Sequence, residues 1–336
     1  MMQQDVKLQS YNTFGFPISC QLFATIKTEQ DFLSLLDSPA FQQKKMILGG
    51  GSNVLFTHDF DGLIIWNQLK GIEKIKEDEH NIWLKVGAGE VWHDFVMYCV
   101  NNDIGGIENL SLIPGYVGAA PMQNIGAYGT ETKDVCESVS FIDFEHGTLH
   151  QLNTTECQFD YRESIFKQEL KEKVFITSVT FKFSKKHEVN TKYGAIEEEL
   201  ALLNITHPSI KQVSDAVIKI RSNKLPDPKK LGNAGSFFKN PIVSEQLAAT
   251  LKQNHPNIPC YPVPQGAKLA AGWLIEQAGW KGHTSGYVGV HQKQALVLVN
   301  YGGGVGNDIL TLSEQIQADV FKKFGVTLER EVNLVG

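Results

Sequence analysis

Residues 111–131, SLIPGYVGAAPMQNIGAYGTE, are rich in glycine and alanine and carry almost no charge. A loop exposed to solvent would carry more charged side chains. Small residues also let the backbone approach another group closely, because no bulky side chain stands in the way. We therefore expect this stretch to pack against something bulky. Taken alone, it fits a buried packing loop somewhat better than a ligand site.

Two further glycine clusters could hold a phosphate. GGGSNVLF, at residues 49–56, follows a predicted strand, and its glycines permit positive φ angles that let amide N–H groups converge on an anion. A tight turn between two strands explains this cluster equally well. GGGVG, at residues 302–306, has Asn307 where a Rossmann fingerprint needs its last glycine, so we interpret it as a plain strand–helix loop. With no Rossmann or P-loop signature, a separate nicotinamide domain is not expected.

Strand and helix signals alternate along most of the chain. Thr28 and Asp31 form a capping-box pattern ahead of the helical face of Phe32, Leu35 and Leu36. Residues 139–183 are β-rich and end with Val179, Phe181 and Phe183 on one face. The other expected strands are residues 46–48, 62–66, 81–86, 295–300 and 326–335. The other expected helices are residues 91–101, 269–278 and 310–324, the last followed by Gly325 as its cap.

Length, charge and cysteine usage limit the class of protein. A chain of 336 residues suits two or three domains. The net charge of −6 gives no basic field for nucleic acid or an anionic membrane. The five cysteines form no C-x-x-C pair, so reduced buried thiols and no metal site are expected. Without a signal pattern or a long apolar run, the chain is expected in the cytoplasm.

Taken together, motifs along nearly the whole chain resemble the UDP-N-acetylenolpyruvoylglucosamine reductase family, in the form with a tyrosine-bearing substrate loop. In chain order they are YNTFG (11–15), ILGGGSNVLF (47–56), the stretch 111–131, YRESIFK (161–167), KLPDP (224–228), GNAGSFFKNP (232–241), AAGWLIEQAGWKG (270–282), HQKQALVLVN (291–300) and LEREV (328–332). The resemblance implies an α+β protein with the FAD-binding fold of vanillyl-alcohol oxidase, also called PCMH-like. Two α/β subdomains are expected, at residues 1–65, joined by the strand 326–336, and at residues 66–215. A C-terminal α/β substrate domain is expected at residues 216–325.

For the cofactor, the resemblance implies non-covalent FAD held mostly by small neutral residues, which let backbone approach an isoalloxazine ring and a pyrophosphate. The implied contacts are Gly49, Gly50, Gly51, Ser52, Asn53, Gly115, Gly118, Gln123, Asn124, Gly126, Ala127, Tyr128, Gly129 and Arg221. Two departures bear on this set. Asn333 stands where the family often has a basic residue, and Ala119 and Ala120 replace serines that some members carry.

The implied substrate is UDP-N-acetylglucosamine bearing an enolpyruvyl ether, whose C=C bond is conjugated with a carboxylate. Hydride addition to the methylene carbon requires charge stabilisation at the carboxylate and a proton for the adjacent carbon. Arg162 suits the first task, because its permanent charge can meet a carboxylate bidentately. Ser236 matches the family's proton donor, and Glu331 matches its active-site acid. Periodicity alone places Glu329 and Glu331 on the same face of the final strand, opposite Leu334.

The resemblance also implies contacts with the sugar nucleotide and an order of events. Tyr193 and Tyr261 match the family's loop tyrosines and are expected over the diphosphate. The other implied substrate contacts are Tyr161, Lys224, Asn240, Lys268 and Gln294. The implied cycle is ping-pong: NADPH reduces FAD and leaves before the sugar takes hydride from flavin N5. The product, UDP-N-acetylmuramate, begins peptidoglycan synthesis, and a monomeric enzyme is expected.

Two alternatives stay open on the sequence. An oxidase of the same flavin fold would pass electrons to oxygen. Such relatives often tether FAD through His or Cys near the glycine turn, and residues 49–56 contain neither, although His58 is close. A non-catalytic FAD or nucleotide-sugar binding module is the other alternative, against which the joint presence of Arg162, Ser236 and Glu331 counts.

Overall fold

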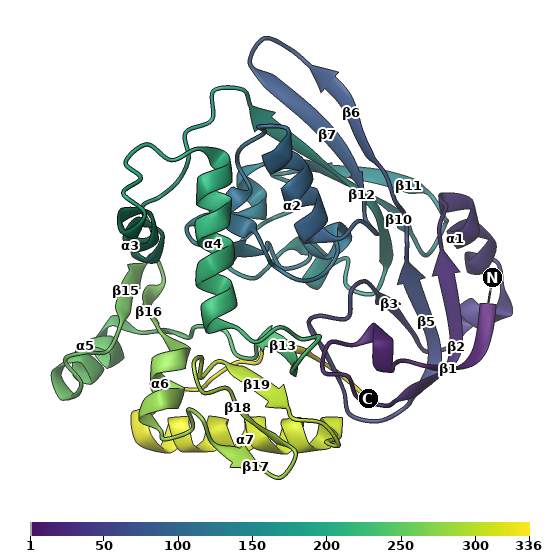
Figure 1. Ribbon diagram of the computed structural model, residues 1–336. Coiled ribbons are helices and arrows are strands. Elements are labelled where there is room, and N and C mark those ends of the chain that lie inside the picture. The colour runs from purple at the N-terminus through teal and green to yellow at the C-terminus, as the bar shows by residue number, and fades with distance from the viewer. Residues whose placement is uncertain (1) are drawn as a thin grey trace. The chain divides into compact units, whose positions relative to one another are not determined.

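The computed structural model describes residues 2–336, which fall into two compact units (Figure 1). Unit 1 comprises the chain up to Val6, Cys20–Gly50 and Asp61–Asn223. Unit 2 comprises Lys7–Ser19, Gly51–Phe60 and Lys224–Gly336. The chain therefore passes from one unit to the other within the glycine cluster at residues 49–56. The finer division of the flavin-binding part into residues 1–65 and 66–215 stays a prediction.

Unit 1 begins with a four-stranded sheet and one helix. The strand order is β1 (Met2–Lys7), β2 (Ser19–Ile26), β5 (Phe60–Asn67) and β3 (Lys45–Leu48), with β3 and β5 parallel. The helix α1 (Glu29–Leu36) has the predicted capping box: Asp31 N–H donates to Thr28 Oγ1 at 3.1 Å, and Thr28 N–H donates to Asp31 Oδ2 at 2.9 Å. Phe32 stacks on Phe175 with ring centroids 4.2 Å apart, next to the 3₁₀ helix η2 (Pro39–Gln42).

A five-stranded antiparallel sheet forms the second layer of unit 1. Its order is β11 (Leu149–Asn153), β10 (Cys136–Asp143), β12 (Val174–Ser184), β7 (Asn81–Gly87) and β6 (Ile72–Glu77). The predicted face of β12 is confirmed, since Val179, Phe181 and Phe183 are buried in one core with Phe95 of α2 (Trp92–Asn101). Each such side chain stabilises the fold by roughly 1.5–3 kcal/mol when fully buried. The helices α3 (Gly194–Leu202) and α4 (Ile210–Lys224) share a smaller apolar cluster.

The neutral stretch of unit 1 folds into short turns rather than long elements. The elements from residue 108 to 134 are η3 (Glu108–Leu110), η4 (Val117–Ala119), β8 (Gly126–Ala127), β9 (Thr130–Glu131) and η5 (Thr132–Asp134), and η6 (Ile165–Lys167) follows later. Val117 and Ala120 are buried in the core beneath the five-stranded sheet. Part of the stretch therefore packs within the protein, as its composition predicted.

Unit 2 contains two small antiparallel sheets and one parallel strand pair. The first sheet has the order β13 (Gly232–Ser236), β19 (Val297–Asn300), β18 (Val288–Val290) and β17 (Thr284–Ser285). The second has the order β14 (Ile242–Val243), β16 (Gly266–Leu269) and β15 (Cys260–Val263), and β4 (Val54–Phe56) pairs in parallel with β20 (Asn333–Val335). Figure 1 shows α7 (Gly306–Phe324) running along the first sheet beside α6 (Ala271–Gln277). The remaining helices of this unit are η1 (Gln9–Tyr11) and α5 (Glu245–Asn254).

Several predicted boundaries in unit 2 are wrong. The helix expected from residue 269 begins at Ala271, because Leu269 pairs with Cys260 at the end of β16. The strand expected at residues 295–300 begins at Val297, and the helix expected from residue 310 begins at Gly306. Gly325 does cap α7, with a φ of 66°.

The final strand is also much shorter than predicted. Only Asn333–Val335 pairs along a neighbour, and Arg330 makes an isolated bridge to Phe238. In the described chain, residues 326–332 form no strand apart from this bridge. Leu334, which periodicity placed on the face opposite Glu329 and Glu331, is 44% exposed.

Candidate active site

The first part of the candidate site in unit 1 is a close approach of two backbone segments. A Cβ atom built on Gly50 would lie 3.1 Å from Cα of Gly115 and 3.3 Å from a ring carbon of Tyr116. A Cβ atom on Gly118 would lie 2.6 Å from Cβ of Ala88. Glycine is thus required here for packing inside the protein.

The turn at residues 123–129 is held by a buried asparagine. The Asn124 side chain is fully buried, its Oδ1 accepts from Lys133 N–H at 3.0 Å, and its Nδ2 donates to Glu131 Oε2 at 3.1 Å and to Asp160 O at 3.2 Å. Asn124 and Tyr128 have positive φ angles of 44° and 51°. Such non-glycine angles cost energy and are maintained by the surrounding structure. Because the Asn124 carboxamide is already engaged, this residue can offer a cofactor only its backbone.

Arg162 lies beside this turn. Its Nη2 donates to Gly126 O at 2.7 Å, and its guanidinium carbon lies 5.4 Å from the centroid of the Tyr161 ring. The backbone of Arg162 has a φ of 55°, and its carbonyl accepts from Lys167 Nζ at 3.0 Å. Arg162, Tyr161 and the predicted flavin turn are therefore brought together within unit 1.

A second group in unit 1 joins Tyr128, Tyr193, Arg221 and His93. The Tyr128 and Tyr193 rings meet edge-to-face with centroids 5.1 Å apart, and the Arg221 guanidinium lies near the Tyr128 hydroxyl. Burial raises the pKa of Tyr128, with Arg221 acting in the opposite direction. Burial and the Arg221 charge lower the pKa of His93, which favours a neutral imidazole at pH 7.

Arg221 carries an unsatisfied donor. Among residues 2–336, the buried Nε of Arg221 has no hydrogen-bond partner. A buried donor left in this state is costly, so an external acceptor at this position would be stabilised. This feature fits an anionic or carbonyl-bearing ligand at Arg221.

Ser236 in unit 2 is displayed by a bulge in β13. The register with β19 shifts between Asn233 and Ser236, and Gly235 has a φ of 70°. Asn233 is buried and fixes this bulge: its Oδ1 accepts from Gly235 N–H at 2.9 Å, and its Nδ2 donates to Leu231 O at 2.8 Å. Within residues 2–336, the Ser236 hydroxyl makes no hydrogen bond.

Glu331 lies next to the Ser236 segment. Its N–H donates to Phe237 O at 2.8 Å, and its carbonyl accepts from Asn53 Nδ2 at 3.2 Å. Glu329, in contrast, has a 71% exposed side chain that pairs with Lys239. Periodicity could not separate the two glutamates, but the structure brings only Glu331 next to the serine and to the glycine cluster.

The part of the glycine cluster that lies in unit 2 contacts Asn333, the residue that stands where the family often has a basic side chain. Gly51 has a φ of 61°, and a Cβ atom there would lie 1.9 Å from Tyr11 O, so no other residue fits. Asn333 donates to Asn53 O from both N–H, at 3.1 Å, and Nδ2, at 3.0 Å. The asparagine at position 333 therefore anchors the cluster backbone, and Ser52 beside it is partly exposed.

Four of the predicted substrate residues gather around β16 and the start of α6 in unit 2. Asn240 Oδ1 accepts from Ala271 N–H at 3.0 Å, and a Cβ atom on Gly272 would lie 3.1 Å from Gln294 Oε1. Lys268 of β16 lies opposite Tyr261 of the neighbouring strand β15. Tyr261 is 56% exposed, so its side chain is accessible to a ligand. Lys224, exposed at the end of α4, makes no hydrogen bond to this group in the described chain.

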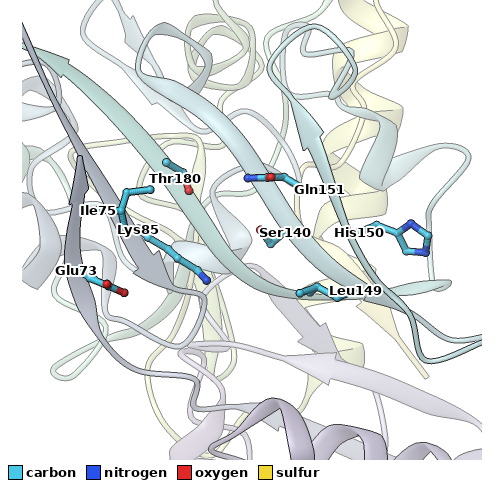
Figure 2. A pocket seen from close by; sticks show the side chains of 8 residues that line it. All are labelled: Glu73, Ile75, Lys85, Ser140, Leu149, His150, Gln151 and Thr180. Atoms are coloured by element: carbon cyan, nitrogen blue, oxygen red, sulfur yellow. The ribbon is translucent and has the colours of Figure 1, made fainter. Parts of the chain in front are cut away.

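The predicted site residues do not line the surface hollow on the five-stranded sheet. Figure 2 shows this hollow, of about 620 Å³, on the face of the five-stranded sheet, with Lys85 and Thr180 among its lining residues. It is an open sheet surface without any convergent set of reactive groups. We assign it no part in the chemistry.

Two supporting residues, Asn109 and Asn233, were missed from the sequence. Both are asparagines that are almost completely buried and that donate to main-chain carbonyls. The surrounding sequence gives no sign of this role, since Asn109 follows a glutamate and Asn233 stands between a glycine and an alanine.

In the described part of the chain, no three His, Cys, Asp or Glu side chains are grouped to hold a metal ion. None of the helices from residue 2 onward combines the length and apolar character needed to cross a bilayer.

Comparison with known proteins decides the family. Residues 227–335 match the profile of the UDP-N-acetylenolpyruvoylglucosamine reductase C-terminal domain, and residues 20–153 match an FAD binding domain. The chain is 49% identical to the UDP-N-acetylenolpyruvoylglucosamine reductase of Flavobacterium johnsoniae, covering 99% of both chains. The chain belongs to the UDP-N-acetylenolpyruvoylglucosamine reductase family.

Other reductases of this name agree. The one from Amoebophilus asiaticus is 48% identical, again over 99% of both chains. The crystal structure of the Thermus caldophilus enzyme superposes with a TM-score of 0.70 at 24% identity, covering both chains completely, which supports the fold. The predicted α+β flavin fold is thus confirmed, and the chain is an FAD-dependent oxidoreductase.

Proposed function

We propose that this chain uses NADPH to reduce UDP-N-acetylglucosamine enolpyruvate to UDP-N-acetylmuramate, in peptidoglycan synthesis. Family membership over the full length supports the reaction class. The observation that carries the proposal is the unengaged hydroxyl of Ser236 in unit 2, which lies beside a main-chain contact to Glu331. Ser236 and Glu331 are linked through the bond from Glu331 N–H to Phe237 O, at 2.8 Å.

Bound FAD would supply the hydride after accepting one from NADPH. Its proposed contacts in unit 1 are Gly49, Gly50, Gly115, Gly118, Gln123, Asn124, Gly126, Ala127, Tyr128, Gly129 and Arg221, and in unit 2 they are Gly51, Ser52 and Asn53. Two features fit this group: glycines at positions with no room for a Cβ atom, and the unsatisfied Nε of Arg221. Backbone N–H groups in a turn with positive φ angles suit a pyrophosphate.

The protein's own part in the chemistry has two components. Arg162 holds the substrate carboxylate through its fixed fork of donors and, with Glu331 orienting the reacting end, stabilises the charge that develops there. Hydride adds to the methylene carbon, the electron pair moves toward the carboxylate, and the adjacent carbon takes the proton from Ser236 Oγ. An uncommitted hydroxyl suits this task, because a serine already donating elsewhere would first have to break that bond.

Binding of the sugar nucleotide is assigned to both units. In unit 1 we propose Tyr161 and Tyr193, and in unit 2 Lys224, Asn240, Tyr261, Lys268 and Gln294. The cations among them would offset the diphosphate charge locally, as a chain with a net charge of −6 requires. We further propose that the chain acts as a cytoplasmic monomer, which light scattering and cell fractionation would test.

An oxidase of the same flavin fold receives less support. His58, the residue that kept this alternative open, has its Nδ1 2.7 Å from the carbonyl oxygen of Asp59. Residues 49–56 offer neither His nor Cys for tethering a flavin.

The decisive experiment follows the flavin spectrum under anaerobic conditions. NADPH should bleach the yellow protein, and UDP-N-acetylglucosamine enolpyruvate should restore its colour. Recolouring by oxygen alone would replace the proposal with the oxidase, and a protein that takes up no FAD would remove both.

A further inference from the structure

The segment that carries Tyr193 lies between β12 and α3 in unit 1. Residues 185–193 are polar and contain no regular element, and Tyr193 is 50% exposed at the N-cap of α3. A connection of this kind is mobile unless other parts of the chain hold it. Its position therefore depends on the contacts that its side chains and carbonyls make.

One such contact is between His187 and the buried carboxylate of Glu108. His187 Nε2 lies 2.6 Å from Glu108 Oε1, and Gly106 N–H donates to Glu108 Oε2, also at 2.6 Å. Glu108 is 2% exposed, so its charge depends on these partners. Gly105 leaves the space for the imidazole, because a Cβ atom there would lie 2.1 Å from the ring. This pair fixes the beginning of the segment.

Asn109, next in the chain, fixes the end of the segment. It is 1% exposed, and its Nδ2 donates to Tyr128 O and to Asn190 O, both at 2.9 Å. Asn190 Nδ2 in turn donates to Gly129 O at 3.1 Å. One buried amide thus ties the predicted flavin turn and the Tyr193 segment together, and the edge-to-face contact between the Tyr128 and Tyr193 rings lies beside it.

We infer that Asn109 is a positioning residue for the sugar nucleotide, acting through Tyr193. Its two donors join the main chain at Tyr128 to the main chain at Asn190, shortly before Tyr193, and so limit where Tyr193 can lie. This inference rests on the proposed function, in which Tyr193 contacts the substrate. It adds to that function a buried side chain, Asn109, that connects the predicted flavin turn to the segment carrying Tyr193.

The test replaces Asn109 by aspartate, which has nearly the same shape. The Nδ2 group that donates to two carbonyl oxygens becomes a carboxylate oxygen, which those carbonyl oxygens repel. Asn109→Asp should raise KM for the enolpyruvyl sugar about tenfold, a size consistent with the loss of one or two hydrogen bonds. The rate of flavin bleaching by NADPH should change less than about twofold. Asn102→Asp is the matched control, because Asn102 is exposed and its Nδ2 donates to a single carbonyl, Tyr98 O, at 2.8 Å.

A double-substitution cycle separates positioning from general loss of structure. If Asn109 acts through Tyr193, Asn109→Asp should add little to the KM of Tyr193→Ala. Asn190→Ala removes the bond from Asn190 Nδ2 to Gly129 O, which also ties the Tyr193 segment to the predicted flavin turn. Because Asn190 is partly exposed, this variant should fold and raise KM even if Asn109→Asp folds poorly.

The outcomes that overturn the inference are distinct from failure of the proposed function. Turnover with an unchanged KM in Asn109→Asp and Asn190→Ala would remove this inference alone. So would an Asn109→Asp effect that multiplies fully with that of Tyr193→Ala. An unsubstituted, FAD-loaded chain that cannot reduce the sugar would remove the proposed function, and this inference with it.

Discussion

The flavin turn of unit 1 and the serine segment of unit 2 use polar side chains in opposite ways. In unit 1, the whole carboxamide of Asn124 is engaged in shaping the backbone. In unit 2, Asn233 shapes the bulge in a similar manner, but the Ser236 hydroxyl next to it remains unengaged within the described residues. A binding surface can consist of well-supported backbone, whereas proton transfer needs a side chain that nothing else holds.

The largest expected effect is the loss of sugar reduction when Ser236 is replaced by alanine. We expect sugar reduction to fall by about 10²–10⁴-fold, the range for loss of a general acid, while FAD binding and bleaching by NADPH persist. Ser244→Ala is the control, since that hydroxyl only caps α5 by accepting from Leu247 N–H at 3.3 Å. The control should lose about 1 kcal/mol of stability and keep its turnover. Unchanged turnover in Ser236→Ala would exclude Ser236 as the proton donor.

Replacing Asn124 by alanine should weaken the flavin turn without touching the chemistry. The Lys133 N–H, the Glu131 carboxylate and the Asp160 carbonyl, all partly buried in these bonds, lose their partner, which costs about 1–3 kcal/mol. We expect a lower unfolding midpoint and faster release of FAD, measured by denaturant unfolding and flavin fluorescence. Asn101→Ala, at an exposed position of α2, should change neither. Normal FAD retention by a destabilised Asn124→Ala protein would separate this turn from the cofactor.

Asn333→Ala should have a smaller effect on the glycine cluster. Asn53 O keeps its bond from the backbone N–H of residue 333 and loses only the bond from the side chain. The loss is about 1 kcal/mol or less, so FAD affinity by titration should fall less than about tenfold. A complete loss of FAD would mean that Asn333 contacts the cofactor directly.

The smallest effect concerns acid stability away from both regions. Burial pushes the pKa of Asp143 up, but bonds from His146 N–H, His150 and Thr148 N–H outweigh it and hold the pKa at about 2. Because the folded-state pKa lies below the ordinary 3.8, the stabilisation is present above about pH 4 and is lost as the pH falls through about 2. Asp143→Asn should flatten the stability curve between these pH values, as measured by urea unfolding. An equally steep curve in the variant would assign the acid sensitivity to other carboxyl groups.

Local patterns predicted the elements that depend on neighbouring residues. The capping box of Thr28 and Asp31, the glycine cap at Gly325 and the buried face of Val179, Phe181 and Phe183 are all confirmed. The final strand was wrong because strand length depends on a partner elsewhere in the chain, and only β4 supplies one.

The candidate site was predictable mainly through motifs, and less through physical pattern. Periodicity left Glu329 and Glu331 on the same face, and the match to the family motif selected Glu331. The roles of Asn109 and Asn124 required partners distant in sequence, which a single asparagine does not reveal. The contacts of Asn333 likewise became clear only once β20 was paired with β4.

The pairing of β4 with β20 has a consequence for the order in which the chain folds during translation. Residues 54–56 leave the ribosome early, but their parallel partners, residues 333–335, are made after almost all the rest of unit 2. The β4–β20 pair of unit 2 therefore cannot form until residue 335 has emerged, whereas every segment of unit 1 is available once residue 223 has emerged. A chain that stops before residue 333 would lack the partner of β4, and its unit 2 would remain without this strand pair.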